Sequence, residues 1–206
     1  MRVIFARHGE STANTLRVFS NKPSVHPLTE KGREQALDLA KRLAGISFSA
    51  VYSSDVLRAV ETSQIVCEQL GLEFTITAAL REFDVGDFEG KSDEIYWQQF
   101  SQLWNDWYAN GLVEKNVGGG ENLLQIRQRL GGFLEMLVKK FGQHDSILCV
   151  SHGGILFAGV PGFARNLEKV VMRDLTLGNT ALVVLDYDGE AWICRQWGDT
   201  IFPAWK

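Results

Sequence analysis

Two short runs of apolar residues constrain the fold of this chain more than any other feature of its sequence. They lie within Arg2–Ala6, near the N-terminus, and within Ser146–Val150, and neither shows the alternation of apolar and polar residues typical of a half-exposed strand. A strand that is apolar on both sides has to be covered on both faces. The runs therefore predict two central strands of a sheet that lies between two layers of helices.

Further strands and helices alternate along the rest of the chain. Four more segments have the composition of strands: Ala50–Ser53, Glu73–Thr77, Thr180–Asp186 and Ala191–Arg195. Helical spacing of apolar residues predicts three helices: one from Thr29 to Leu43, one from Val56 to Gly71 and one from Leu123 to Gly142. We therefore predict an α/β fold, a three-layer α/β/α sandwich with a mostly parallel central sheet. The last two strands are expected to form a hairpin around Asp188-Gly189.

The segment from about residue 87 to residue 120 interrupts this alternation. Aromatic residues recur in it at helical spacing, and it closes with three consecutive glycines: Trp97, Phe100, Trp104, Tyr108, then Gly118-Gly119-Gly120. We expect a small helical cap over one end of the sheet that returns through a flexible glycine loop. The spacing favours packing of the aromatic rings against the body of the protein, the alternative being that Trp104 or Trp107 lines the entrance of a site. The chain has 206 residues, 45% of them hydrophobic, so we expect residues 1–206 to form a single domain with this insertion.

The charge balance and the cysteines limit the partners and the compartment. The formal net charge is −4, with 21 basic and 25 acidic residues, and no basic stretch indicates nucleic acid or a membrane surface as a partner. A small anion is compatible with this balance, because the local charge of a cleft can oppose the net charge. Three widely spaced cysteines, and no apolar stretch long enough for a signal peptide or a membrane span, predict a cytoplasmic protein without disulfides. The oligomeric state stays open, a homodimer being one option.

Histidines follow both apolar strands, at the edge where open α/β sheets bind their ligands. Arg7 and His8 come directly after the first run, and His152 follows the second, where Gly153-Gly154 opens a helix whose N-terminus could bind an anion. A single histidine at a strand end is more often a hydrogen-bonded structural residue than a catalyst. Their recurrence at corresponding strand ends instead predicts a shared site, in which the positive groups would repel one another unless an anion lay among them.

Two more charged residues belong to the same edge of the predicted sheet. Arg58 falls in the first turn of a helix that Ser54 or Asp55 would cap, where a cation opposes the helix dipole at a cost of up to about 1 kcal/mol. A bound anion would reverse that effect. Glu82 follows the third strand and is either a loop carboxylate paired with Arg81 or a proton donor beside a phosphate.

Six stretches of the sequence, in order and at compatible spacing, resemble the histidine phosphatase superfamily, the phosphoglycerate-mutase-like proteins. They are Arg7-His8-Gly9-Glu10-Ser11 with Asn14, HPLTEKGREQA, SSDVLRAVET, REFDVGDFEG, Ser151-His152-Gly153-Gly154, and Asn179 before the last hairpin. The resemblance covers most of the chain. It implies the fold expected above and an enzyme that transfers phosphoryl groups through a phosphohistidine.

The resemblance also implies a role for each matching residue. His8 would attack phosphorus through a neutral ring nitrogen, and Glu82 would protonate the leaving alkoxide and then activate the hydrolytic water. The phosphate oxygens would be held by a further set of residues: Arg7, Asn14, Arg58 and His152, with Ser54 and the backbone N–H of Gly153 as weaker assignments. No metal and no cofactor are implied, and the expected partner is a small phosphomonoester. Glu10 is assigned only a structural ion pair or loop hydrogen bond.

The superfamily contains hydrolases and mutases, and the insertion favours a hydrolase. Trp97–Gly120 contains no arginine, Asp93 lies near the position where mutases carry a lysine, and Val85 replaces a tyrosine that is usual in mutases. A mutase has to retain a doubly anionic bisphosphate, which requires additional positive charge. We therefore expect a histidine acid phosphatase-type phosphomonoesterase that acts on a small phosphorylated metabolite. Two alternatives remain: a cofactor-dependent phosphoglycerate mutase-type enzyme, and a non-catalytic regulatory protein that binds a phosphorylated ligand.

Overall fold

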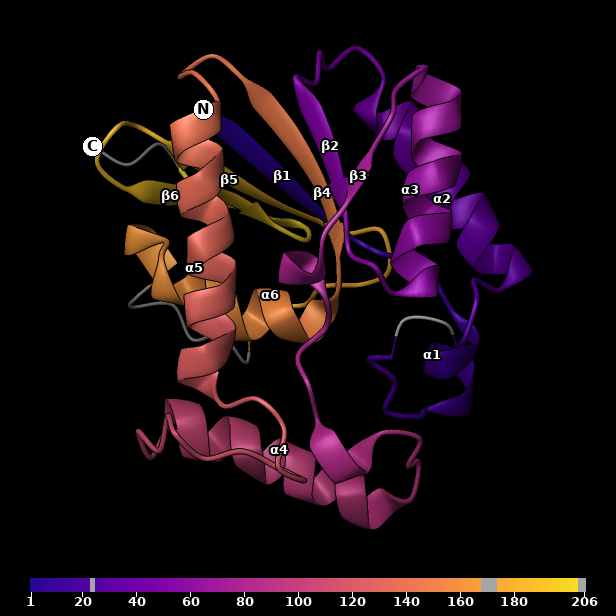
Figure 1. The fold of residues 1–206 in the computed structure, drawn as a ribbon, viewed down its shortest axis with the longest axis vertical. Coiled ribbons are helices and arrows are strands. Elements are labelled where there is room, and N and C mark those ends of the chain that lie inside the picture. Colours follow the sequence, from indigo (N-terminus) through magenta and orange to yellow (C-terminus); the bar gives the residue numbers. More distant parts are fainter. Residues whose placement is uncertain (23–24, 168–173, 204–206) are drawn as a thin grey trace.

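Seven strands of the described residues form one sheet, in the order β3-β2-β4-β1-β5-β6-β7 (Figure 1). The structure is a computed structural model, and it describes residues 1–22, 25–167 and 174–203. The strands are β1 (Arg2–Arg7), β2 (Ala50–Ser53), β3 (Thr75–Ile76), β4 (Ser146–Ser151), β5 (Leu182–Tyr187), β6 (Trp192–Trp197) and β7 (Thr200–Ile201). All six predicted strands are present with small shifts of their ends, and the two-residue edge strand β7 is an addition that the sequence patterns do not predict.

The parallel part of the sheet positions the site. β1 runs parallel to β4, with Ala6 opposite Val150, and β2 also runs parallel to β4, with Ser53 opposite Val150. These three strands therefore end at the same level, and the residues that follow them meet at one edge. On the other side of β1 the sheet is antiparallel: β5 pairs with β1, β6 with β5 and β7 with β6. The strands β5 and β6 form the predicted hairpin.

Alternate residues of β1 enter two separate cores. Val3 and Phe5 belong to the core covered by α5 (Leu123–Lys140) and α6 (Gly153–Gly159). Ile4 and Ala6 belong to the core covered by α2 (Glu30–Leu43) and α3 (Leu57–Leu70). Burying a side chain of the size of valine to phenylalanine stabilises the fold by roughly 1.5–3 kcal/mol. The predicted three-layer α/β/α sandwich, with its central strands covered on both faces, is confirmed.

Capping residues set several helix ends near the predicted positions. The Thr29 side chain caps α2, and Gly71 ends α3 in the left-handed region, with a φ of 67°. The start of α3 differs from the prediction, because Val56 is its N-cap in place of Ser54 or Asp55. Ser54 Oγ instead accepts a hydrogen bond from the N–H of Val56 over 3.2 Å, so it orders the turn before the helix.

The predicted cap lies across one end of the layers (Figure 1). It contains the 3₁₀ turn η2 (Gly86–Phe88) and α4 (Glu94–Tyr108) and leads back to α5. The N–H of Asp87 donates to the carbonyl oxygen of Gly118 over 2.9 Å, and a Cβ on Gly86 would lie 1.8 Å from that oxygen. Two backbones approach this closely only where side chains are absent. Gly86 and Gly118 therefore serve the close packing of the cap against its return loop, and the flexibility expected of that loop stays a prediction.

Short helical turns make the remaining connections. They are α1 (Thr12–Leu16), η1 (Ala78–Leu80), η3 (Val160–Gly162) and η4 (Arg165–Leu167). Within the described ranges, no helix combines the length and the apolar character needed to cross a membrane.

Candidate active site

The structure brings together the residues that follow three parallel strands. His8 follows β1, Ser54 follows β2 and His152 follows β4. Their backbones extend the strand pairing, since the N–H of His8 donates to Ser151 O over 3.0 Å and the N–H of Ser54 to Val150 O over 2.9 Å. The rings of His8 and His152 lie 5.1 Å apart, and both are buried. The two histidines predicted to share a site are thus neighbours.

His8 is a neutral imidazole with one unprotonated ring nitrogen. Its Nδ1 lies 2.6 Å from the carbonyl oxygen of Gly9, and because a carbonyl only accepts, Nδ1 carries the proton. Nε2 therefore keeps its lone pair, and it accepts a hydrogen bond from Arg58 Nε over 3.0 Å. Burial, followed by the charges of Arg58 and Arg7, lowers the pKa of His8 well below 6.5. Nε2 is thus available as a nucleophile at neutral pH.

Arg7 and Arg58 are cations whose hydrogen bonding is incomplete. Arg58 Nη2 donates to the carbonyl oxygen of Ser20 over 2.8 Å, and Arg7 Nη1 to that of Leu177 over 2.7 Å. Arg58 Nη1 and Arg7 Nε are buried and have no partner within the described part of the chain. Burial lowers the pKa of both groups, that of Arg58 to about 10, so both stay charged at neutral pH. Buried donors of this kind require an acceptor, and an anion supplies one to both.

His152 is oriented by Ser54. Its Nε2 lies 2.7 Å from Ser54 Oγ, and its Nδ1 is buried with no partner among the residues described. Burial, followed by the positive charge of Arg58, lowers the pKa of His152 well below 6.5. Ser54 therefore orients His152, and its direct contact with phosphate stays a prediction.

The Glu82 carboxylate is bound by the first amides of α6. Its Oε2 accepts a hydrogen bond from the N–H of Gly154 over 2.8 Å, and its Oε1 accepts one from the N–H of Ile155 over 2.6 Å. The helix N-terminus that the sequence predicts as an anion site therefore holds a carboxylate of the protein itself. Arg81, the partner expected for a simple loop carboxylate, pairs with Asp55 instead. Glu82 is thus held at the cavity rather than by an ion pair at the surface.

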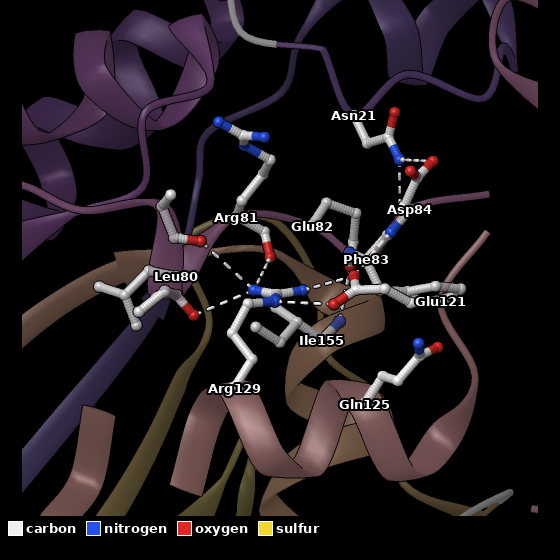
Figure 2. A network of polar contacts seen from close by, with 12 residues as sticks. Asn21, Leu80, Arg81, Glu82, Phe83, Asp84, Glu121, Gln125, Arg129 and Ile155 are labelled. Atoms are coloured by element: carbon white, nitrogen blue, oxygen red, sulfur yellow. Dashed lines mark hydrogen bonds and ion pairs between the residues drawn. The ribbon is translucent and has the colours of Figure 1, made fainter. Parts of the chain in front are cut away.

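Arg129 of α5 clamps the loop that carries Glu82 (Figure 2). Its Nε and Nη2 donate to the two carboxylate oxygens of Glu121 over 2.9 and 2.7 Å. Its Nη1 donates to carbonyl oxygens of the loop, among them that of Arg81 over 2.9 Å. Glu121 in turn accepts a hydrogen bond from the N–H of Asp84 over 2.9 Å. The backbone is therefore fixed on both sides of Glu82 by one guanidinium–carboxylate pair.

Asn14 and Gly153 line the cavity beside the arginines. Asn14 Oδ1 accepts hydrogen bonds from the N–H and the hydroxyl of Ser11 over 3.0 and 3.1 Å, so its amide NH₂ is the group left to bind a ligand. Gly153 begins α6, and a Cβ at this position would lie 3.5 Å from Arg7 Nε. Both residues thus line the same cavity as Arg7 and Arg58, and their contacts with phosphate stay predictions.

Glu10 fastens the loop after β1 to the start of α2. Its carboxylate accepts hydrogen bonds from Lys31 Nζ over 2.9 Å and from Thr29 Oγ1 over 3.0 Å. The Lys31 ammonium is the first cause of a lowered pKa at this carboxyl group. A Cβ on Gly32 would lie 2.0 Å from the carbonyl oxygen of Glu10, so the two backbones touch there. The glutamate therefore has the structural role expected of it, and it steadies the segment that carries His8.

One cavity of about 1050 Å³ extends from His8 to the cap, and neither Ser54 nor His152 is among the residues that line it. Its histidine end is lined by Arg7, His8, Asn14, Arg58, Glu82 and Gly153. Ser20 and Asn21 also line it, and Ser20 Oγ is buried without a partner in the described part of the structure. Neither residue is predicted from the sequence as part of the site. Both stand in the stretch NTLRVFSN, close behind Asn14, and this proximity is the signal that could have found them.

The two interpretations of the cap aromatics apply to different residues. Trp107 is 2% exposed, donates its Nε1 hydrogen to Lys115 O over 2.8 Å and belongs to the core. Trp104 packs against the same core and also lines the cavity, where its ring is stacked on that of Tyr108. Trp104 is therefore the residue of the two that can meet a ligand.

The chain is similar to known proteins along most of its length. The model of the histidine phosphatase superfamily (branch 1) matches residues 3–200. A protein of Salmonella choleraesuis named "Probable phosphoglycerate mutase GpmB" is 28% identical over 200 residues, which cover 96% of this chain and 90% of that protein. The crystal structure of the alpha-ribazole phosphatase from Shigella flexneri is 27% identical, covers 100% of both chains and has a TM-score of 0.77. A mycobacterial glucosyl-3-phosphoglycerate phosphatase, 23% identical over 97% of this chain and 99% of its own, shares the fold with a TM-score of 0.78.

Proposed function

This chain belongs to the histidine phosphatase superfamily, and from that premise we propose that it is a phosphomonoesterase that hydrolyses a small phosphorylated metabolite through a phosphohistidine on His8. The environment of His8 carries the proposal. Its Nε2 is unprotonated and accepts a hydrogen bond from Arg58 Nε, beside two arginines that each have a buried donor without a described partner. A neutral nucleophile among unsatisfied cationic donors suits a phosphate monoester, which brings both the electrophile and the missing acceptors.

In the first step, His8 Nε2 attacks phosphorus and the bond between phosphorus and the ester oxygen breaks. Protonated Glu82 gives its proton to the departing alkoxide, which leaves as the free alcohol. Because the lone pair of Nε2 is now used for bonding, Arg58 Nε has to turn its hydrogen bond from Nε2 to a phosphate oxygen. The Gly9 carbonyl oxygen, 2.6 Å from Nδ1, stabilises the positive charge that the ring acquires.

We assign four groups to the phosphoryl oxygens during the transfer. Arg7 Nε and Arg58 Nη1 have no other described partner, and Asn14 lines the same cavity. His152 is fully buried and does not line the cavity, but its Nδ1 also lacks a described partner and its ring lies 5.1 Å from that of His8. Donors that are fixed before the reaction stabilise the transition state without reorganisation, and removal of a single donor of this kind costs about 10²–10³-fold in rate.

In the second step, a water molecule enters on the side vacated by the alcohol. Glu82, now a carboxylate, accepts a proton from the water as its oxygen attacks phosphorus. The bond between phosphorus and Nε2 breaks, the ring recovers its lone pair and phosphate leaves. Glu82 is again protonated, so the cycle closes without any other proton donor.

Phosphoglycerate mutase-type transfer is the second candidate, because of the name carried by the Salmonella relative. Such an enzyme has to hold a second anionic group of its substrate between two half-reactions. Among the described residues that line the cavity, the cap contributes no lysine or arginine. This composition supports hydrolysis over transfer between two positions of one substrate.

Trapping of the covalent intermediate tests the proposal. Wild-type protein, His8→Ala and the exposed His144→Ala as a matched control are mixed with ³²P-labelled phenyl phosphate and quenched in base, in which a phosphohistidine survives. We expect an acid-labile label and turnover in wild type and His144→Ala, and neither in His8→Ala. Label with isomerisation of 3-phosphoglycerate dependent on the 2,3-bisphosphate would establish the mutase instead. Tight phosphate binding without label or turnover in wild type would establish a non-catalytic binding protein.

A further inference from the structure

The end of the cavity away from His8 has an apolar wall. The cavity is lined by seven aromatic residues from four separate parts of the chain: Phe19, Phe83, Trp97, Phe100, Trp104, Tyr108 and Phe157. Leu175 and Leu177 add aliphatic surface. A wall of this kind is typical of a pocket that binds a ligand through apolar contact, with a few polar groups fixing its orientation.

The aromatic rings hold one another in place. The ring of Trp97 is stacked on that of Phe19 at a centroid distance of 4.1 Å, and Trp97 Nε1 donates to Arg17 O over 3.0 Å. The hydroxyl of Tyr108 donates to Phe157 O over 2.6 Å. These two polar atoms are therefore engaged with the backbone, and the surface that Trp97 and Tyr108 leave to a ligand is carbon.

The charged side chains among the described lining residues all lie at the histidine end. They are Arg7, Arg58 and Glu82, beside His8. Three cations near this end stay outside the lining: Lys115 pairs with Asp106, Lys91 lies over the ring of Tyr96, and Arg127 donates to the carbonyl oxygen of Ala158. Arg17 lies over the Trp97 ring on its exposed side and also stays outside the lining. Among the described lining residues, a second anionic group on a substrate would therefore lie against rings, where it loses hydration and meets no opposite charge.

Resting on the phosphomonoesterase activity proposed above, we infer that the leaving alcohol is an uncharged molecule with an aromatic or bulky apolar body, and that monoesters carrying a second anionic group are rejected. The cavity of about 1050 Å³ has room for a ring system in addition to the phosphate. Asn105, an exposed residue of α4 that lines the same cavity, offers a neutral amide to a hydroxyl or carbonyl of the ligand.

Two matched esters test this inference: 4-carbamoylbenzyl phosphate and 4-carboxybenzyl phosphate. The two differ in charge but little in size, and the methylene group insulates the leaving oxygen from the substituent. We expect kcat/KM to be at least about tenfold higher for the carboxamide, because burying an unpaired carboxylate is penalised. Equal values, or a preference for the carboxylate, would overturn the inference while leaving the phosphomonoesterase proposal intact.

A charge-introducing variant separates the pocket from the rest of the surface. Asn105→Lys should shift the ratio of the two kcat/KM values toward the carboxylate by about tenfold. Gln99→Lys, an exposed position of the same helix outside the cavity lining, adds the same charge and should leave the ratio unchanged. An equal shift in both variants would mean that the wall of the cavity does not set the preference.

If neither ester is hydrolysed, that result counts against the proposed phosphomonoesterase activity alone. The preference of the cavity for an uncharged ligand can then be measured by binding. Calorimetry with the two corresponding arylethylphosphonates, in which CH₂ replaces the ester oxygen, measures the same discrimination as a ratio of Kd values. We expect at least about tenfold tighter binding of the carboxamide. Equal Kd values would refute the inference in that case.

Discussion

Replacement of Gly154 by alanine is expected to disable proton donation while leaving phosphate binding in place. A Cβ at this position would lie 2.7 Å from Glu82 Oε1 and 2.7 Å from Phe83 Cε1. Such distances are not tolerated, so the carboxylate has to recede by about 0.7 Å to reach an ordinary contact of 3.4 Å. Gly154 does not have a positive φ, so the backbone itself accepts alanine.

The size of the effect follows from this displacement. Misplacement of a catalytic group by about 1 Å costs about 10²-fold in rate, and general acid catalysis as a whole contributes about 10²–10⁴-fold. We therefore expect kcat/KM of Gly154→Ala to fall by about 10²-fold for an alkyl phosphate, whose alkoxide needs the proton. For 4-nitrophenyl phosphate, whose leaving group is stable as an anion, we expect a loss of less than about tenfold.

The assay compares kcat/KM for the two esters, because this constant reports on the steps up to cleavage of the ester bond. Gly132→Ala is the matched control: it lies in α5, its added Cβ would meet nothing within 4 Å, and it should change neither constant. Glu82→Gln should reproduce the split between the esters. An equal loss on both esters, or no loss on the alkyl ester, would refute the assignment of Glu82 as the acid that Gly154 positions.

Two further predictions concern pH and the clamp on the loop. Burial lowers the pKa of His8 and His152 in the folded protein well below 6.5. In the unfolded chain the two histidines take up protons as the pH falls through about 6.5, whereas in the folded protein they stay neutral. A lower pH therefore favours the unfolded state. The melting temperature, measured by circular dichroism in phosphate-free buffer, should therefore fall as the pH is lowered from 7.5 to 5. The fall should be less steep in His8→Gln. A melting temperature that rises as the pH is lowered would contradict the burial argument. Arg129→Lys loses the bidentate contact with Glu121 and should lower the free energy of unfolding in urea by about 1–3 kcal/mol, against less than about 0.5 kcal/mol for the exposed Arg33→Lys. In the same variant kcat/KM should fall more for an alkyl than for an aryl phosphate, because the loop of Glu82 is loosened; an equal fall would assign Arg129 a purely structural role.

The sequence alone was sufficient for the order of elements and for the convergence of the histidines. The runs that became β1 and β4 are apolar on both sides, and this local pattern requires cover on both faces. Once these strands are parallel neighbours, His8 and His152 have to meet at their ends. Such features are predictable because they depend on short-range periodicity and on one topological rule.

Only the tertiary structure decided what each of the other groups contacts. The sequence pattern predicts the N-terminus of α6 as an anion site, and the fold gives its amides to Glu82, 72 positions away in the chain. Arg129 clamps that loop from α5, and the apolar wall combines Phe19 with rings of α4 and α6. These contacts depend on where separate segments meet in space, and neither hydrophobic periodicity nor motif spacing contains that information. The position of the nucleophile is therefore a property of local sequence, whereas the anchoring of the acid and the character of the pocket are properties of the assembled fold.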